Sequence, residues 1–279
     1  MSWEPGAATR LPLAALALAA AVLAACTTTS TTSTGGQPPT AEADRGRGNA
    51  SDDGDAARRA RTRLELASAY FGSGQLNTAL DEVKLALAAD PNMGAGYNLR
   101  GLIYGRLGED KLAEESFRRA LQIDPRDADA MQNYGWFMCQ RQRHAEAETM
   151  FRQALGVPQY RDVPRTMLTQ GICQARAGQW MQAEATLTRS YELDPSNPAT
   201  AVNLAEVLFR RNELERARFY IRRVNANRDL SSAQTLWLAA RIEHKLGNRQ
   251  GVQEFGTQLR SRFPQSREAA AFEQGKFDE

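Results

Sequence analysis

The chain has 279 residues, of which 42% are hydrophobic and 24% are charged, so it can build a sizeable core. Its formal net charge of +2 favours no charged partner, and no basic run with interleaved aromatic residues occurs. Together these features argue against a nucleic-acid-binding protein.

The N-terminus has the features of a targeting segment. Residues 11–25 are Leu, Ala and Val with one Pro, a run as long as a signal-peptide core but shorter than the ~20 apolar residues of a membrane-spanning helix. The run ends in Leu-Ala-Ala before Cys26, which resembles a bacterial lipobox, where the Cys is lipidated and the signal removed. We therefore expect residues 1–25 to be a lipoprotein signal peptide and Cys26 to carry the lipid. An ordinary secretory signal followed by an accidental Cys is the alternative.

The segment after the lipobox predicts a location and a tether. Thr27 follows Cys26, and under the lipoprotein sorting rule a residue other than Asp there implies the outer membrane. The protein would then be lipid-anchored in the inner leaflet and face the periplasm. Residues 26–55 are rich in Thr and Ser and then in Gly, Pro and charge, which predicts a disordered tether with a reach of about 30 Å.

A repeat follows the tether. Pro91 and Pro125 lie 34 positions apart, and the residues before them match at identical offsets. The matching sets are Ala67, Tyr70, Gly74, Ala79, Val83 and Ala86, and then Gly101, Tyr104, Gly108, Ala113, Phe117 and Ala120. A period of this length is typical of stacked helix hairpins, which usually bind other proteins.

Each unit is expected to contain two amphipathic helices. In the second unit, Gly108 ends the first helix, because a left-handed C-cap position prefers Gly, and Asp124-Pro125 ends the second. Gly101 and Ala113 are small where the two helices cross closely. A larger side chain at either position would destabilise the fold by roughly 1–3 kcal/mol.

The pattern matches the tetratricopeptide repeat. Six units begin at Ala60, Gly94, Ala128, Pro164, Pro198 and about Ser232. The link before the fourth unit is longer, the fifth has Asn212 in place of the turn Gly, and the sixth is degenerate. The predicted fold is all-α, a right-handed superhelical solenoid over residues 56–265. Residues 266–279 would form a capping helix or tail over its terminal apolar face.

In tetratricopeptide repeats the first helix of each unit lines a concave groove. Carried over to this sequence, the groove residues are Leu64, Ser68, Phe71, Asn98, Leu102, Arg106, Gln132, Trp136, Gln140, Leu168, Ile172, Arg176, Val202, Glu206, Phe209 and Arg210. Such an apolar groove with a polar edge suits a peptide with apolar anchors. Trp136 is a candidate hot spot or, alternatively, part of the packing between repeats. Three arginines, Arg106, Arg176 and Arg210, are candidates for a carboxylate clamp, although solvated edge residues are the favoured interpretation.

Two cysteines lie late in the first helices of adjacent units. Because neighbouring first helices run side by side, Cys139 and Cys173 are candidates for a disulfide worth ~3 kcal/mol, provided their Cα atoms lie within about 7 Å. Two small buried hydrophobic residues are the alternative. His144 falls in the turn after Cys139, so no catalytic dyad is expected. No metal-ligand spacing, nucleophile elbow or phosphate-binding glycine loop occurs, so the sequence predicts neither an enzyme nor a bound metal or cofactor.

The whole arrangement resembles the type IV pilus biogenesis/stability lipoprotein, or pilotin, family. The most specific similarity is the third-repeat segment Asn133-Tyr134-Gly135-Trp136-Phe137-Met138-Cys139. The longer third-to-fourth link, Cys173 and the turn Leu246-Gly247-Asn248 are also similar.

The resemblance implies a non-enzymatic role. Such proteins bind subunits of the pilus secretin, the ring-shaped outer-membrane channel, and promote its localisation and oligomerisation. The alternative is a tetratricopeptide lipoprotein scaffold for other envelope-assembly or peptidoglycan proteins. Neither interpretation involves nucleic acid or a small-molecule substrate.

Overall fold

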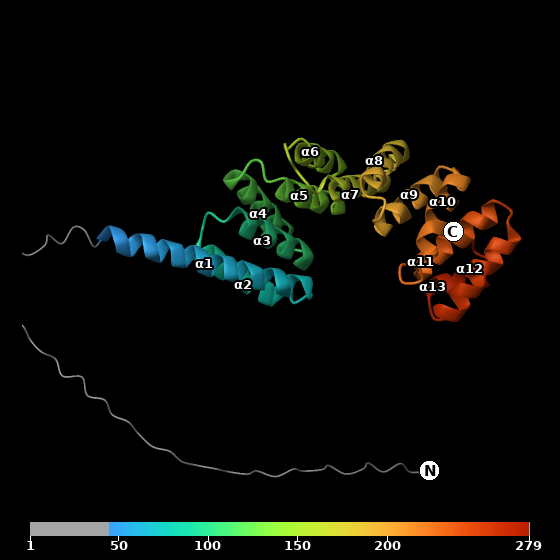
Figure 1. The fold of residues 1–279 in the computed structure, drawn as a ribbon, viewed down its shortest axis with the longest axis horizontal. Helices are drawn as coiled ribbons and strands as arrows, with labels where there is room; N and C mark the ends of the chain where they lie inside the picture. Colours follow the sequence, from blue (N-terminus) through green and yellow to red (C-terminus); the bar gives the residue numbers. More distant parts are fainter. Residues whose placement is uncertain (1–44, 279) are drawn as a thin grey trace, which may run out of the picture. The chain divides into compact units, whose positions relative to one another are not determined.

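The computed structural model describes residues 45–278, so the predicted signal peptide, Cys26 and most of the predicted tether lie outside the described residues. The chain divides into two compact units, Met1–Gly46 and Arg47–Glu279. Residues 45–278 form thirteen helices and no strand (Figure 1). The helices are α1 (Arg45–Gly72), α2 (Leu76–Ala89), α3 (Gly94–Leu107), α4 (Asp110–Ile123), α5 (Ala128–Gln140), α6 (His144–Leu155), α7 (Val163–Arg176), α8 (Trp180–Leu193), α9 (Pro198–Arg210), α10 (Leu214–Asn225), α11 (Ala233–Lys245), α12 (Arg249–Arg262) and α13 (Arg267–Glu273).

The helices of the second unit pack as consecutive hairpins. Helices α3 and α4, α5 and α6, and α7 and α8 pair closely, and α5 also packs against α3 and α7. Within this unit the first helices of the hairpins follow the inner side of a curve and the second helices its outer side (Figure 1). The predicted solenoid of tetratricopeptide-like hairpins is therefore confirmed. In the part of the chain that the structure describes, no helix has both the length and the apolar composition needed to cross a membrane.

Each hairpin turns on a residue with left-handed backbone. The φ angles are 78° at Gly74, 82° at Gly108, 62° at Gln142, 74° at Gly178, 62° at Asn212 and 71° at Gly247. A non-glycine residue in this conformation costs roughly 1–2 kcal/mol, because its Cβ approaches the following carbonyl oxygen. The third and fifth repeats thus keep the turn geometry even though they lack the glycine.

The small residues of the first helices mark the close crossings. A Cβ added to Gly101 would lie 2.8 Å from the ring of Phe117 in α4. A Cβ on Gly171 would lie 2.6 Å from Leu187 in α8. The same arrangement recurs in different repeats, which indicates that the glycine allows the two helices of a hairpin to approach closely.

The longer link between α6 and α7 is packed against the solenoid. Val157 and Tyr160 contact the buried side chains of Ala128, Met131 and Ala154. The hydroxyl of Tyr160 lies 2.8 Å from the hydroxyl of Thr166 in α7. The extra residues therefore form an ordered joint between the third and fourth repeats.

The prediction of a disordered tether is wrong for its last residues, 45–55. Helix α1 begins at Arg45, so residues 45–55 are helical rather than disordered. A segment with few apolar residues has little to bury, but it can still form a helix. The Ala and Arg residues that join this segment to the first repeat have high helix propensity. Helix extension from an already formed helix avoids the cost of nucleation.

The last helix covers the end of the solenoid. Ser266 caps α13 by accepting a hydrogen bond from the backbone of Ala269 at 3.0 Å. The chain then turns back, and the ring of Phe277 packs at 5.3 Å from that of Trp237 in α11. The Nε of Arg241 donates to the carbonyl oxygen of Phe277 at 3.0 Å. A segment outside the six repeats thus covers the terminal apolar face.

Candidate functional site

The candidate site is the groove formed by the first helices of the N-terminal repeats. A cavity of about 160 Å³ lies between α1, α3 and α5. Its apolar lining includes the rings of Phe71 and Trp136 and the side chain of Leu102, all half-buried. Arg106, Asn133 and Gln140 supply polar groups at the same cavity. The arrangement offers apolar surface to a ligand with a few polar groups to orient it.

Aromatic rings on the first helices are covered by cations from the next repeat. Arg106 in α3 lies 5.7 Å from the ring centroid of Phe71 in α1, and Arg176 in α7 lies 4.7 Å from that of Trp136 in α5. Each such contact at an exposed site is worth roughly 0.5–1 kcal/mol. The rings and the arginines can be identified in the sequence, but their pairing was not predicted. The signal was an aromatic residue in one first helix and an arginine at the end of the next.

Two of the three groove arginines have free hydrogen-bonding capacity. Within residues 45–278, Arg106 and Arg176 form no ion pair, whereas Arg210 binds Glu206 one turn earlier at 2.9 Å. A guanidinium over a ring keeps its in-plane donors available for a carboxylate. Arg106 and Arg176 are therefore the stronger candidates for binding an acidic group.

The remaining predicted groove residues fall into two classes. Asn98 is half-buried and accepts a hydrogen bond from Asn133 at 3.1 Å. The other exposed or half-buried ones are Leu64, Ser68, Gln140, Leu168, Ile172, Val202 and Glu206. Gln132 and Phe209 are buried, with 4% and 3% exposure, so the prediction that they present surface to a ligand is wrong. Gln132 turns its amide toward Thr169 in α7, at 3.4 Å.

Phe209 is buried because the sixth repeat covers it. The cations of Arg241 and Lys245 in α11 each lie 4.8 Å from its ring centroid. Burial lowers the pKa of Arg241 from its ordinary value. Phe209 therefore presents no surface to a ligand, and the apolar cavity of the groove lies over the earlier repeats.

The two cysteines lie between the third and fourth repeats. The structure joins Cys139 in α5 and Cys173 in α7 in a disulfide, with 5.8 Å between their Cα atoms. Both are buried. The Nδ1 of His144, the first residue of α6, lies 3.6 Å from the Sγ of Cys173. In the sequence His144 is close only to Cys139, so its contact with Cys173 was not predicted.

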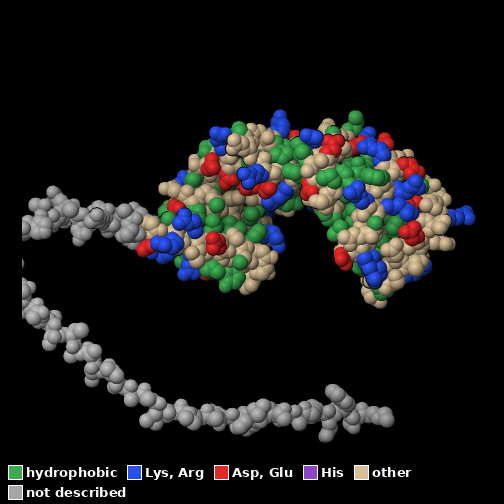
Figure 2. All heavy atoms as spheres, viewed as in Figure 1, with side chains coloured by type: hydrophobic (Ala, Val, Ile, Leu, Met, Phe, Trp, Pro, Cys, Tyr) green, Lys and Arg blue, Asp and Glu red, His purple; other side chains and the backbone are tan. Residues whose placement is uncertain are grey.

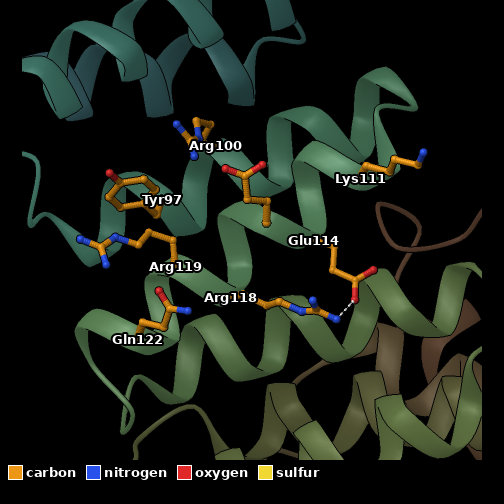
Figure 3. A pocket seen from close by; sticks show the side chains of 8 residues that line it. Tyr97, Arg100, Lys111, Glu114, Arg118, Arg119 and Gln122 are labelled. Carbon is orange, nitrogen blue, oxygen red and sulfur yellow. Dashed lines mark hydrogen bonds and ion pairs between the residues drawn. The ribbon is translucent and has the colours of Figure 1, made fainter.

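A second hollow lies on the outer side of the second repeat. It has a volume of about 710 Å³ and is lined by Tyr97, Arg100, Lys111, Glu114, Glu115, Arg118, Arg119 and Gln122 (Figure 3). Arg143 donates to Glu114 at 2.9 Å, and this bond holds the pKa of the Glu114 carboxyl below its ordinary value. Figure 2 shows acidic and basic side chains interspersed over the visible face, with no broad region of one sign.

The comparisons with known sequences agree with the fold. Profiles of the tetratricopeptide repeat match residues 94–127, 116–149 and 174–242. The chain is 26% identical to the type IV pilus assembly protein PilF of Pseudomonas aeruginosa over 235 residues, covering 84% of this chain and 89% of PilF. It is 24% identical to an uncharacterised protein of Haemophilus influenzae over 135 residues, covering 48% of this chain and 75% of that protein.

Solved structures give the same relationship. The chain resembles the crystal structure of PilW, a widely conserved type IV pilus biogenesis factor, with a TM-score of 0.71 and 34% identity over 76% of this chain and 97% of PilW. The structure of Pseudomonas aeruginosa PilF gives a TM-score of 0.67 and 25% identity over 79% and 99% of the two chains. YrrB, a tetratricopeptide-repeat protein with an unusual peptide-binding site, shares the fold at a TM-score of 0.55 and 18% identity, over 69% of this chain and 97% of YrrB.

Proposed function

The chain belongs to the tetratricopeptide-repeat family of type IV pilus biogenesis proteins, and from this premise we propose that it binds subunits of the pilus secretin. In this proposal it is an outer-membrane lipoprotein that brings the subunits to that membrane and promotes their oligomerisation. The role is one of binding and positioning, with no catalytic step. The observation that carries the proposal is the half-buried Trp136 beneath Arg176, at the cavity of the N-terminal repeats.

The groove would hold a secretin segment with apolar anchors. Phe71, Leu102 and Trp136 supply apolar surface at one cavity, and Arg106 supplies a cation beside it. An extended or helical peptide whose apolar side chains enter this groove would bury area that otherwise promotes aggregation of free subunits. An acidic group on the same peptide would pair with Arg106 or Arg176 and fix its direction.

The lipid anchor would supply the localisation. Acyl chains on Cys26 would contribute roughly 0.8 kcal/mol for each buried CH₂, so several chains together commit the complex to a membrane. Subunits bound to anchored protein are confined near one surface, which raises their effective concentration for ring formation. Binding and anchoring would thus act on the same step.

Deletion of the gene tests the binding role. We expect the outer membrane of the deletion strain to lose detergent-resistant secretin multimers while secretin monomers are still made, because localisation and oligomerisation both depend on this protein. Both forms are measured by immunoblotting of isolated membranes. Complementation with the wild-type gene is the control. Full retention of secretin multimers after deletion would contradict the proposed function.

Substitution of Cys26 tests the anchor. We expect Cys26→Ser to release the protein from the outer-membrane fraction, because serine lacks the thiol that receives the lipid. Thr27→Asp is the matched control, since it keeps the lipidated cysteine and should move the protein to the inner membrane. Unchanged outer-membrane fractionation of Cys26→Ser would refute lipidation at this residue.

A further inference from the structure

Three potential metal ligands from three helices meet at the joint between the third and fourth repeats. Cys139 lies at the end of α5, His144 begins α6 and Cys173 lies in α7. One ligand atom of each lies within 4.8 Å of the others. The sequence showed no metal-binding spacing, because the ligands come together only through the packing of two repeats.

We propose that reduction of the Cys139–Cys173 disulfide creates a site for a thiophilic divalent cation of the zinc class, held by Cys139, Cys173 and His144. The same cysteine pair would then be either a covalent bond between α5 and α7 or two ligands of one metal ion. In both states the third and fourth repeats are joined at the same point.

The distances fit zinc. Tetrahedral zinc bonds sulfur at about 2.3 Å and nitrogen at about 2.0 Å, which places a sulfur and a nitrogen ligand about 3.5 Å apart. The Nδ1 of His144 and the Sγ of Cys173 are already 3.6 Å apart. Two sulfur ligands of zinc are about 3.8 Å apart by the same geometry. With 5.8 Å between the Cα atoms, rotation of the two side chains supplies this separation once the bond is broken.

The surroundings favour two thiolates at this place. His144 is the first residue of α6, so the positive end of that helix lies at the cluster, where it favours negative charge. Cys139 and Cys173 are 2% and 3% exposed and belong to a core cluster with Met138 and Phe151. An apolar shell of this kind limits the access of water to a bound metal.

The nearby carboxylate of Glu148 is bound to other residues and does not engage the three proposed ligands. Glu148, one turn further along α6, has its two carboxylate oxygens engaged by Gln170 at 2.8 Å and Gln174 at 3.2 Å. A cation at this place would be held through the lone pair of the His144 Nδ1. Three protein ligands leave a fourth position for water.

Conversion of the disulfide to the metal site begins with reduction of the sulfur–sulfur bond. A dithiol reductant transfers two electrons and two protons to the sulfur–sulfur bond, which gives two thiols here and one disulfide in the reductant. A divalent cation then displaces the two thiol protons and binds the two thiolates with neutral His144. Exchange with an oxidised disulfide, which accepts the two electrons and becomes a dithiol, returns the Cys139–Cys173 bond and releases the metal.

Cobalt binding tests the site. The full chain with Cys26→Ser retains only Cys139 and Cys173 as cysteines, since the sequence has three. It is reduced with a phosphine under nitrogen and titrated with Co²⁺, and thiolate-to-cobalt charge-transfer absorption is recorded. We expect one Co²⁺ per chain, displacement by Zn²⁺, and no such absorption from the oxidised chain.

Two histidine variants separate the three-ligand site from binding by cysteines alone. His144→Ala should weaken Co²⁺ binding at least ~10-fold, whereas His244→Ala, at the exposed end of α11, should bind as the parent does. No charge-transfer absorption in the reduced parent, or equal affinity in His144→Ala, would overturn the proposal. If reduction lowers the helical circular dichroism, added Zn²⁺ should restore it, and failure to do so would also count against the site.

Discussion

The guanidinium of Arg176 in α7 lies over the indole ring of Trp136 in α5, with 4.7 Å between the Arg176 Cζ and the ring centroid. The same indole lines the cavity of the N-terminal repeats beside Phe71 and Leu102. Trp136 therefore contacts the next repeat and also presents surface to the groove. The two interpretations of this residue, hot spot and inter-repeat packing, predict different amounts of lost affinity and lost stability.

Replacement of Trp136 by alanine should weaken binding of secretin subunits at least ~10-fold, because a half-buried indole at a groove is a typical anchor. The free energy of unfolding should fall by less than about 1.5 kcal/mol, since the ring is only partly buried. Binding is measured by surface plasmon resonance and stability by urea unfolding of the same samples.

The matched control is Trp180→Ala. Trp180 begins α8 and is 37% exposed, and its helix lies on the outer side of the repeats. This variant should retain the affinity of the parent. A large drop in melting temperature of Trp136→Ala with normal affinity would mean that the indole belongs to the core rather than to the binding surface.

Removal of the disulfide should destabilise the solenoid. The bond joins residues 34 positions apart, and closing a loop of this size stabilises a fold by about 4 kcal/mol in the chain-entropy account. We expect Cys139→Ala combined with Cys173→Ala to lower the free energy of unfolding by that amount, which is measured as a lower urea midpoint. The double variant should also be insensitive to reductants, which lower the midpoint of the parent. Equal midpoints of the oxidised parent and the double variant would contradict a stabilising bond.

The repeats could be predicted because their determinants are local and recur. A glycine such as Gly101 faces a bulky residue of the next helix, Phe117, and the same pairing returns at Gly171 and Leu187. Hairpin ends were marked by Gly and Asp-Pro at fixed offsets. A period of this kind specifies register, helix type and the close crossings at once.

The finer features of the candidate site depend on how one repeat is placed against the next. Arg241 and Lys245 of the following repeat lie over the ring of Phe209, which is buried. His144 contacts Cys173 because α6 begins beside α7. Neither relationship has a local signal, since each joins residues in different repeats.

Enlargement of Gly101 tests the close crossing. Gly101→Ala should lower the free energy of unfolding by roughly 1–3 kcal/mol, because the new methyl group would lie 2.8 Å from the ring of Phe117. Gly54→Ala is the control: nothing lies within 4 Å of its added Cβ, and alanine there should stabilise α1 by up to about 1 kcal/mol. Urea unfolding measures both. Equal effects of the two changes would show that helix propensity, not packing, dominates.

The third turn offers a stabilising change. Gln142 has a φ of 62°, so Gln142→Gly should relieve backbone strain and raise the free energy of unfolding by about 1 kcal/mol. Gln122→Gly, at an exposed helical position of α4, should have the opposite effect by a similar amount. Thermal unfolding of both variants tests the sign. A lower melting temperature for Gln142→Gly would refute the strain argument.

The most direct measurement is capture of the bound partner by the protein itself. The wild-type chain and Trp136→Ala, each with an affinity tag, are purified from detergent-solubilised envelopes, and the captured proteins are identified by quantitative mass spectrometry. We expect the pilus secretin to be the most abundant partner of the wild type and to be depleted at least ~10-fold with the variant. Capture of cell-wall enzymes or other assembly factors in place of the secretin would contradict secretin binding and support the scaffold alternative.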